Sequence, residues 1–159
     1  MAILTEEGRV VIADSISIRP IHLAWGLGDG VWLTAPPEDA GATGLLDEVG
    51  RRTATQVQFV VPDVAGEIVL PSGSFTLSGT STNHLFISTQ FDFADASSSV
   101  IREIGVFVGT EMIAGLPPGQ EYFVPAEIDG PGRLLHIENI DPLYRSPAIR
   151  ESFQIVITF

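Results

Sequence analysis

Short stretches in which apolar and polar residues alternate make up most of the chain, and turn residues separate them. Alternation with a period of two is typical of strands that bury one face of an antiparallel sheet. The predicted strands cover residues 21–25, 31–33, 53–61, 66–70, 83–93, 98–109, 112–116, 121–128, 133–140 and 152–159. The pattern therefore predicts a mainly β fold, a β-sandwich-like antiparallel domain with one or two short accessory helices.

A helix is predicted near the start of the chain. Thr5 is a suitable N-cap, two glutamates follow it, and Val10, Val11 and Ala13 can form an apolar stripe. The β-branched residues in this segment leave a strand over residues 9–18 as the alternative.

The second predicted helix covers Thr43–Arg52. Thr43 can cap it, and its leucines share one face. Two favourable i,i+4 charge pairs support it, Asp47–Arg51 and Glu48–Arg52. Each pair contributes only about 0.2 to 0.5 kcal/mol, so this helix depends on packing of its leucine face.

The strand predicted over Ser98–Gly109 is apolar on both faces, so it is expected to be covered on both. Arg102 and Glu103 are neighbours that point to opposite faces, and each therefore needs a partner from elsewhere. Gly105 leaves space where a side chain would stand, which indicates a bulge or a close approach of another backbone. One interpretation is a central strand of a single chain, and the other is a strand that also contacts a neighbouring subunit.

The final segment alternates regularly between apolar and polar residues. Its apolar positions are Phe153, Ile155, Ile157 and Phe159. Burial of such side chains stabilises a fold by roughly 1.5 to 3 kcal/mol each. We therefore expect this segment to be held in the core.

Length, composition and charge narrow the possible functions. The 159 residues are expected to form a single domain over 1–159, with 45% hydrophobic and 18% charged residues. All basic residues are arginines, and the net charge of −12 argues against a nucleic-acid partner. The start of the chain lacks the features of a signal peptide, which predicts synthesis in the cytoplasm, and no stretch is long and apolar enough for membrane insertion.

Candidate chemistry is sparse, and we predict no enzyme activity, no cofactor and no metal. The glycine-rich turn at 26–30 lacks the spacing of a dinucleotide site, and the three histidines are scattered. Asp92 and Asp95 could bind calcium, although carboxylates followed by serines are more typical of a solvated loop. A hydrolase is a third alternative, and it would require at least that mutation of His22, His84 or His136 abolishes activity.

The chain resembles the tail-collar fibre family of bacteriophage tail proteins over nearly its whole length. The main motif is Ile101-Arg102-Glu103-Ile104-Gly105-Val106-Phe107, which is similar to the family's I-R-E-I-G-L-F. Further matching positions are Leu4-Thr5, Gly8, Ile12-Ala13, Gly26–Gly30, Leu46, Glu48-Val49, Arg51 or Arg52, Met112-Ile113-Ala114 and Pro117-Pro118. The chain departs from the family at Val108–Glu111, where members usually carry a D-x-D-G turn.

The resemblance implies a non-enzymatic structural virion protein of a phage-type tail, acting as a baseplate or tail-fibre attachment adaptor. The expected partners are further copies in a homotrimer, other tail or baseplate proteins and a separate fibre protein. No shaft or receptor-binding tip is expected to follow the anchoring domain. The resemblance places interface or structural roles on Ile101, Arg102, Glu103, Ile104, Gly105 and Phe107.

A carbohydrate-binding β-sandwich module is the alternative. Its stacking surfaces would come from Trp25, Trp32, Tyr122 and Tyr144. Aromatic residues in a small β protein also serve as core, so this alternative depends on their being exposed.

Overall fold

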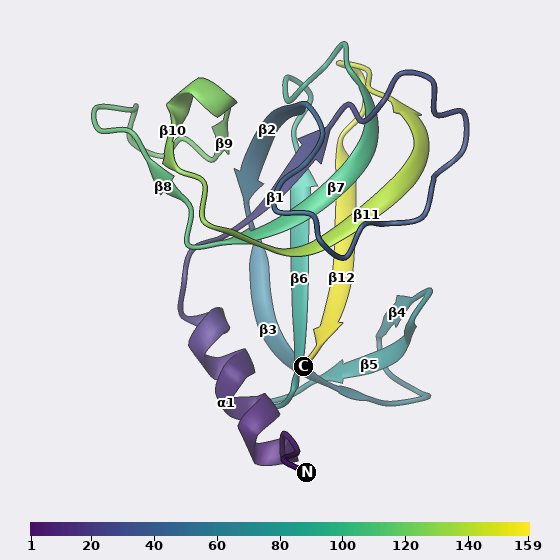
Figure 1. The fold of residues 1–159 in the computed structure, drawn as a ribbon, viewed down its shortest axis with the longest axis vertical. Helices are drawn as coiled ribbons and strands as arrows, with labels where there is room; N and C mark the ends of the chain where they lie inside the picture. Colours follow the sequence, from purple (N-terminus) through teal and green to yellow (C-terminus); the bar gives the residue numbers. More distant parts are fainter. The chain divides into compact units, whose positions relative to one another are not determined.

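A computed structural model describes residues 1–159 (Figure 1). The prediction of a mainly β protein with antiparallel sheets is confirmed, with one α-helix and one 3-10 helix. The chain forms two compact units. Unit 1 comprises Met1–Arg19, Ala54–Thr89 and Ser152–Phe159, and unit 2 comprises Pro20–Thr53 and Gln90–Glu151. That the whole of 1–159 acts as a single domain stays a prediction.

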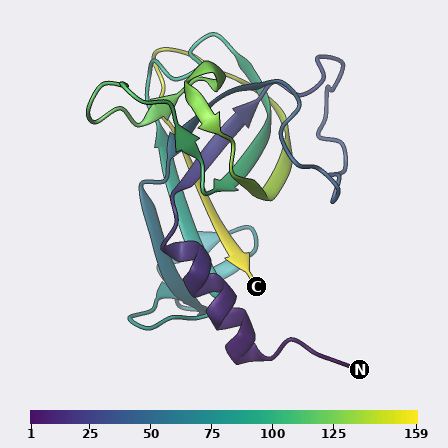
Figure 2. The same cartoon turned by 60° about the vertical axis from the view of Figure 1, so that its left-hand side comes forward.

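The helix predicted near the start of the chain is present as α1 (Glu6–Ser17), and the alternative strand is wrong. The Thr5 hydroxyl accepts a hydrogen bond from the Gly8 N–H at 3.1 Å, which satisfies one of the free donors of the first turn. Ala13 is buried, whereas Val11 is 59% exposed and does not belong to the buried stripe. The residues that precede Thr5 extend from the start of α1 (Figure 2).

The sheet of unit 1 has the strand order β12-β6-β3-β5-β4. Its strands are β3 (Gln56–Pro62), β4 (Ile68–Leu70), β5 (Gly73–Leu77), β6 (His84–Phe91) and β12 (Glu151–Thr158). Val60, Phe75 and Phe86 form a buried cluster against which Ile68 and Val156 pack. β5 was not among the predicted strands and lies in the gap between the predicted strands 66–70 and 83–93.

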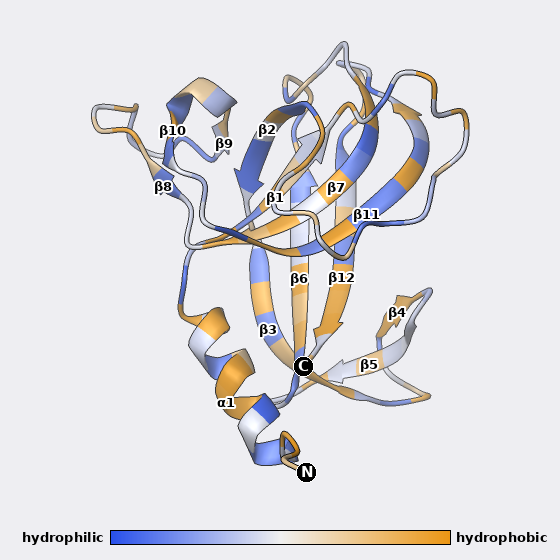
Figure 3. Ribbon diagram, in the orientation of Figure 1, coloured by the Kyte–Doolittle hydropathy of each residue, from blue (hydrophilic) through white to orange (hydrophobic).

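The C-terminal strand is confirmed as β12, but its burial is lower than predicted. Phe153, Ile155 and Ile157 are only half-buried, although the polar Ser152, Gln154 and Thr158 are exposed as expected. β12 lies at one edge of its sheet and pairs on one side only, so its side chains have fewer neighbours than those of a central strand. The strand is hydrophobic toward its C-terminal end (Figure 3).

The main sheet of unit 2 has the order β11-β7-β1-β2-β9. Its strands are β1 (Ile21–Gly26), β2 (Glu48–Thr53), β7 (Val100–Val108), β9 (Tyr122–Phe123) and β11 (Arg133–Tyr144). β7 pairs with β1 and β11, antiparallel in both cases. Six of its residues are buried in succession at its C-terminal end, Glu103–Val108, in agreement with a strand covered on both faces.

The predicted helix over Thr43–Arg52 is wrong, because Glu48–Thr53 form strand β2 between β1 and β9. Asp47 has a positive φ of 60°, which is incompatible with a continuing right-handed helix. In a strand, Arg51 and Arg52 point to opposite faces and reach different buried partners. Those contacts outweigh the weak helical charge pairs on which the prediction depended.

Other predicted boundaries also differ. Residues 31–33 form no strand, and the predicted strand over 112–116 is reduced to β8 (Glu111–Met112). The predicted strand over 121–128 is divided into β9, the 3-10 helix η1 (Pro125–Glu127) and β10 (Ile128–Gly130), which pairs with β8. β11 continues through Asp141-Pro142 to Tyr144 by a shift of register between Asn139 and Leu143. No helix is long and apolar enough to cross a membrane.

Candidate functional site: the loop held by β7

The predicted site residues form the buried centre of unit 2. Ile101, Ile104 and Phe107 are 0%, 6% and 2% exposed. Gly105 pairs with Ala24 of β1 and Ile137 of β11 without a bulge. A Cβ at Gly105 would lie 2.9 Å from Leu45 Cδ2, so packed side chains, rather than a bulge or a passing backbone, occupy the space that glycine leaves.

Arg102 holds the start of the loop that connects β1 to β2. Its Nε donates to the carbonyl oxygen of Trp32 and its Nη1 to that of Leu27, both at 3.2 Å. Gly28 lies between these two points with φ +59°, and a Cβ there would come within 2.8 Å of the Trp32 ring. The glycine-rich turn therefore allows the loop to fold close around Arg102.

Glu103 holds the other end of the same loop. Its Oε2 accepts a hydrogen bond from the Leu46 N–H at 2.7 Å, and the residue is only 4% exposed. Burial raises the pKa of Glu103, and the backbone hydrogen bonds from Leu46 and Gly28 oppose this rise only in part. Arg102 thus binds the start of one loop, residues 27–47, and Glu103 binds its end at Leu46 as well as Gly28 near its start.

Backbone and side-chain contacts complete the attachment of loop 27–47. The Leu27 and Gly28 N–H groups bond the carbonyl oxygens of Asp47 and Leu46 at 3.0 and 3.1 Å, which closes the base of the loop. From β11, Asn139 Nδ2 donates to the Pro36 carbonyl oxygen at 3.0 Å. The loop, dark blue in Figure 1, is therefore joined to β7 and β11 by polar contacts.

Arg51, which is 2% exposed, was not among the predicted site residues. Its Nε and Nη2 each donate to a carboxylate oxygen of Glu48 at 2.7 Å, and Nη1 donates to Thr110 Oγ1 and the Pro131 carbonyl oxygen. Its guanidinium carbon lies 3.9 Å from the centre of the Phe107 ring. All these contacts together satisfy a buried cation.

Arginines also account for the two aspartates that were considered for calcium. Asp95 pairs with Arg52 at 2.7 Å and Asp92 with Arg150 at 2.9 Å. The Arg145 side chain, fully buried, donates to the carbonyl oxygens of Asp92 and Asp95 at 2.9 and 3.3 Å. The sequence contained one indication of these contacts, since all of its basic residues are arginines. A guanidinium group can donate to several acceptors at once.

The three histidines lie on three different strands. His22 and His136 lie on β1 and β11, separated by β7, and His84 lies on β6 of unit 1. Burial, with a smaller contribution from nearby Arg51, lowers the pKa of His22 to about 4. Burial also lowers the pKa of His84 and His136.

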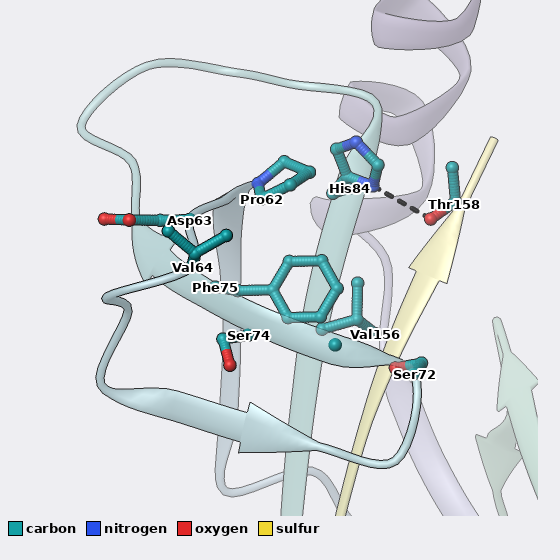
Figure 4. A pocket seen from close by; sticks show the side chains of 10 residues that line it. Pro62, Asp63, Val64, Ser72, Ser74, Phe75, His84, Val156 and Thr158 are labelled. Carbon is teal, nitrogen blue, oxygen red and sulfur yellow. Dashed lines mark hydrogen bonds between the residues drawn. The ribbon is translucent and has the colours of Figure 1, made fainter.

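A hollow of about 590 Å³ in unit 1 is open to solvent. Phe75 and Val156 line it, and His84 Nδ1 lies 2.8 Å from Thr158 Oγ1 at its border (Figure 4). Asp63, at the same border, accepts hydrogen bonds from the Ala65 N–H and the Thr76 hydroxyl, which lower its pKa. The His84 ring is thus hydrogen-bonded to Thr158, and the Asp63 carboxylate is held by Ala65 and Thr76.

The four aromatic residues considered for sugar stacking have different environments. Trp25 is fully buried and stacks on Phe91, with ring centroids 3.5 Å apart. Tyr122 is half-buried in β9, and burial raises its pKa to about 12. Tyr144 is 74% exposed, and Trp32 packs against the turn at Gly28. The structure therefore places Trp25 in the core and does not bring the four together on one surface.

Fold and site define a β-rich structural module in which charged side chains bind backbone groups and hold a long loop in place. The whole chain, residues 1–159, matches the family model described as "Baseplate wedge 3 tail fiber network component". The chain belongs to this family, and it is a structural component of a phage baseplate and tail-fibre network, located in the virion tail. The comparison with curated proteins finds no match.

Proposed function

We propose that the protein is a non-enzymatic adaptor of the tail-collar type that connects a baseplate to a separate fibre protein and acts as a homotrimer. The observation that carries the proposal is the attachment of loop 27–47 through Arg102 and Glu103 of β7. A loop fixed at both ends is a preorganised contact surface, which reduces the entropy lost when a partner binds. The partners are further copies of the chain and other tail proteins, and the acidic net charge of −12 disfavours nucleic acid.

In this proposal, the residues of the segment Ile101–Phe107 have two different roles, one in the core and one in positioning the loop. Ile101, Ile104 and Phe107 provide core, and Gly105 admits the Leu45 side chain of the loop. Arg102 and Glu103 determine the shape that the loop presents to the neighbouring subunit. The assembly role therefore depends on side chains that lie behind the contact surface.

Replacement of Arg102 tests this role. Arg102→Ala removes the hydrogen bonds to the Leu27 and Trp32 carbonyl oxygens. We expect the fraction of oligomer in mass photometry to fall at concentrations where the wild-type protein is assembled, while the melting temperature of the protein changes little.

The matched control is Arg19→Ala, because Arg19 is exposed and removing it subtracts the same charge. This control should retain the wild-type oligomer mass. An unchanged mass for Arg102→Ala together with a large drop in melting temperature would show that Arg102 has a purely structural role and would reject the proposal.

A further inference from the structure

Residues of loop 27–47, β7 and β11 line an open hollow of about 440 Å³. Its lining is mainly apolar and includes Trp32, Pro37, Leu45, Leu46 and Ile137, with Glu103 as its buried carboxylate. We call this hollow the Glu103 pocket. Its apolar walls suit an aliphatic chain, and its carboxylate suits a cation at the end of that chain.

The carboxylate of Glu103 has no positive partner in the chain. By contrast, buried Asp95 pairs with Arg52 and half-buried Glu48 pairs with Arg51, each at 2.7 Å. Glu103 is 4% exposed, yet no arginine, histidine or terminal amine lies within 4.0 Å of it. A buried charge without an opposite charge is unfavourable, so a cation that enters the pocket would gain this interaction.

The chain itself has few cations left to supply. It contains no lysine, and Arg51, Arg52, Arg102 and Arg145 are bound to internal groups. Asp39 lines the pocket, and Glu38 accepts a hydrogen bond from the Asn139 N–H at 3.3 Å, which adds negative charge at the border. The charge of the site is therefore complementary to a cation from another molecule.

A second hollow of about 260 Å³ borders the pocket beside β11. Asp39, Ala42 and Ile137 line both hollows. Glu38 and Glu138 act electrostatically on His136, which lines the second hollow, so carboxylates accompany the groove along its length. A groove of this form accommodates a segment of polypeptide better than an isolated ion.

We propose that the Glu103 pocket receives a lysine or arginine side chain from a neighbouring baseplate or fibre protein. The aliphatic part of that side chain packs on Trp32, Leu45 and Ile137, and its cationic end binds the carboxylate of Glu103. This inference rests on the proposed adaptor function and specifies the chemistry of the partner. A bare metal ion is a poorer occupant, because no three metal-binding side chains cluster in the structure.

The test is an NMR titration of the full chain with N-acetyl-arginine methylamide and N-acetyl-lysine methylamide. N-acetyl-norleucine methylamide is the uncharged probe of similar shape. We expect one or both cationic probes to shift the amide signal of Leu46 and the indole signal of Trp32 with a roughly millimolar dissociation constant. The norleucine probe should bind about tenfold more weakly, since it lacks the charge-assisted hydrogen bond.

Two variants locate the binding. Glu103→Gln keeps an oxygen acceptor for the Leu46 N–H and should weaken the cationic probes about tenfold. Gly44→Leu should narrow the pocket, because Gly44 lines it. No atom lies within 4 Å of the position of its Cβ, so the leucine is accommodated without a clash. Gly30→Leu is the matched control in the same loop, since its Cβ position is equally free and it does not line the pocket.

The outcomes separate this inference from the adaptor function. Equal affinity of the cationic probes for the wild-type protein and Glu103→Gln would overturn it, and so would shifts spread over exposed carboxylates with none at Leu46. Failure to bind either cationic probe would also overturn it. None of these results changes the oligomer mass of Arg102→Ala, which tests the adaptor function by itself.

Discussion

Acidification from pH 6.5 to pH 4 should destabilise the protein through His22. The folded-state pKa of His22 is about 4, against 6.5 for an unperturbed histidine, because burial and nearby Arg51 disfavour its charged form. Between these values the unfolded chain binds a proton that the folded chain does not, so unfolding becomes more favourable as the pH falls. The stabilising contribution is complete above pH 6.5 and is lost as the pH falls to about 4.

The size of the effect follows from the difference between the two pKa values. At about 1.4 kcal/mol per pKa unit, the shift corresponds to about 3 kcal/mol of unfolding free energy. His22 is 5% exposed and its Nδ1 has no hydrogen-bond partner, so little solvent screening reduces this amount. Such a loss is a large fraction of the unfolding free energy of a typical domain, which is about 5–15 kcal/mol.

Urea unfolding at fixed protein concentration, repeated between pH 4 and pH 7, measures the effect. His22→Leu removes the titrating group, so the unfolding free energy of the variant should fall less over this range, by about 3 kcal/mol. The difference between wild type and variant cancels the contributions of His84, His136 and Glu103, which titrate in both proteins. A difference that does not change with pH, or an NMR titration of His22 near pH 6.5, would refute the reasoning.

Two further predictions concern named contacts. Glu48→Gln leaves the Arg51 guanidinium buried without its charge partner, so it should lower the free energy of unfolding in urea by about 3–5 kcal/mol. Glu121→Gln changes a carboxylate whose side chain is 64% exposed, so it should lower this free energy by less than about 1 kcal/mol. Similar losses for both would show that burial does not determine the strength of these pairs. Thr5→Ala removes the N-cap of α1 and should reduce unfolding free energy by about 1 kcal/mol, while Thr5→Ser should retain most of it; equal losses from both changes would exclude the hydroxyl as the cause.

A strand could be predicted from the sequence where it pairs with neighbouring strands on both sides, because such a strand is apolar on both faces. β7 lies between β1 and β11, and its sequence is apolar on both faces as a central strand requires. β5 lies between two turns and is only five residues long, so the alternation within it was too short to distinguish from the turns. The helix predicted over Thr43–Arg52 failed because local propensity is weak compared with a buried ion pair such as that between Arg51 and Glu48.

The site was predictable in part. The opposite orientation of Arg102 and Glu103 correctly indicated that each needs a partner elsewhere. The partners themselves, backbone groups of Trp32 and Leu46, lie 70 and 57 positions away in sequence, and no local pattern connects them. Whether the same residues also contribute to a subunit interface stays a prediction.

The two tryptophans have different environments, so their intrinsic fluorescence can report on different parts of the chain. Trp25 is fully buried on Phe91, so its emission should be blue-shifted and resistant to quenching by iodide or acrylamide. Trp32 lies in loop 27–47 beside Arg102 and is only partly buried, so its fluorescence should respond to quenchers and to a partner that covers the loop. Assembly of the particle could therefore be followed at this loop without a label, with Trp25 as the internal reference.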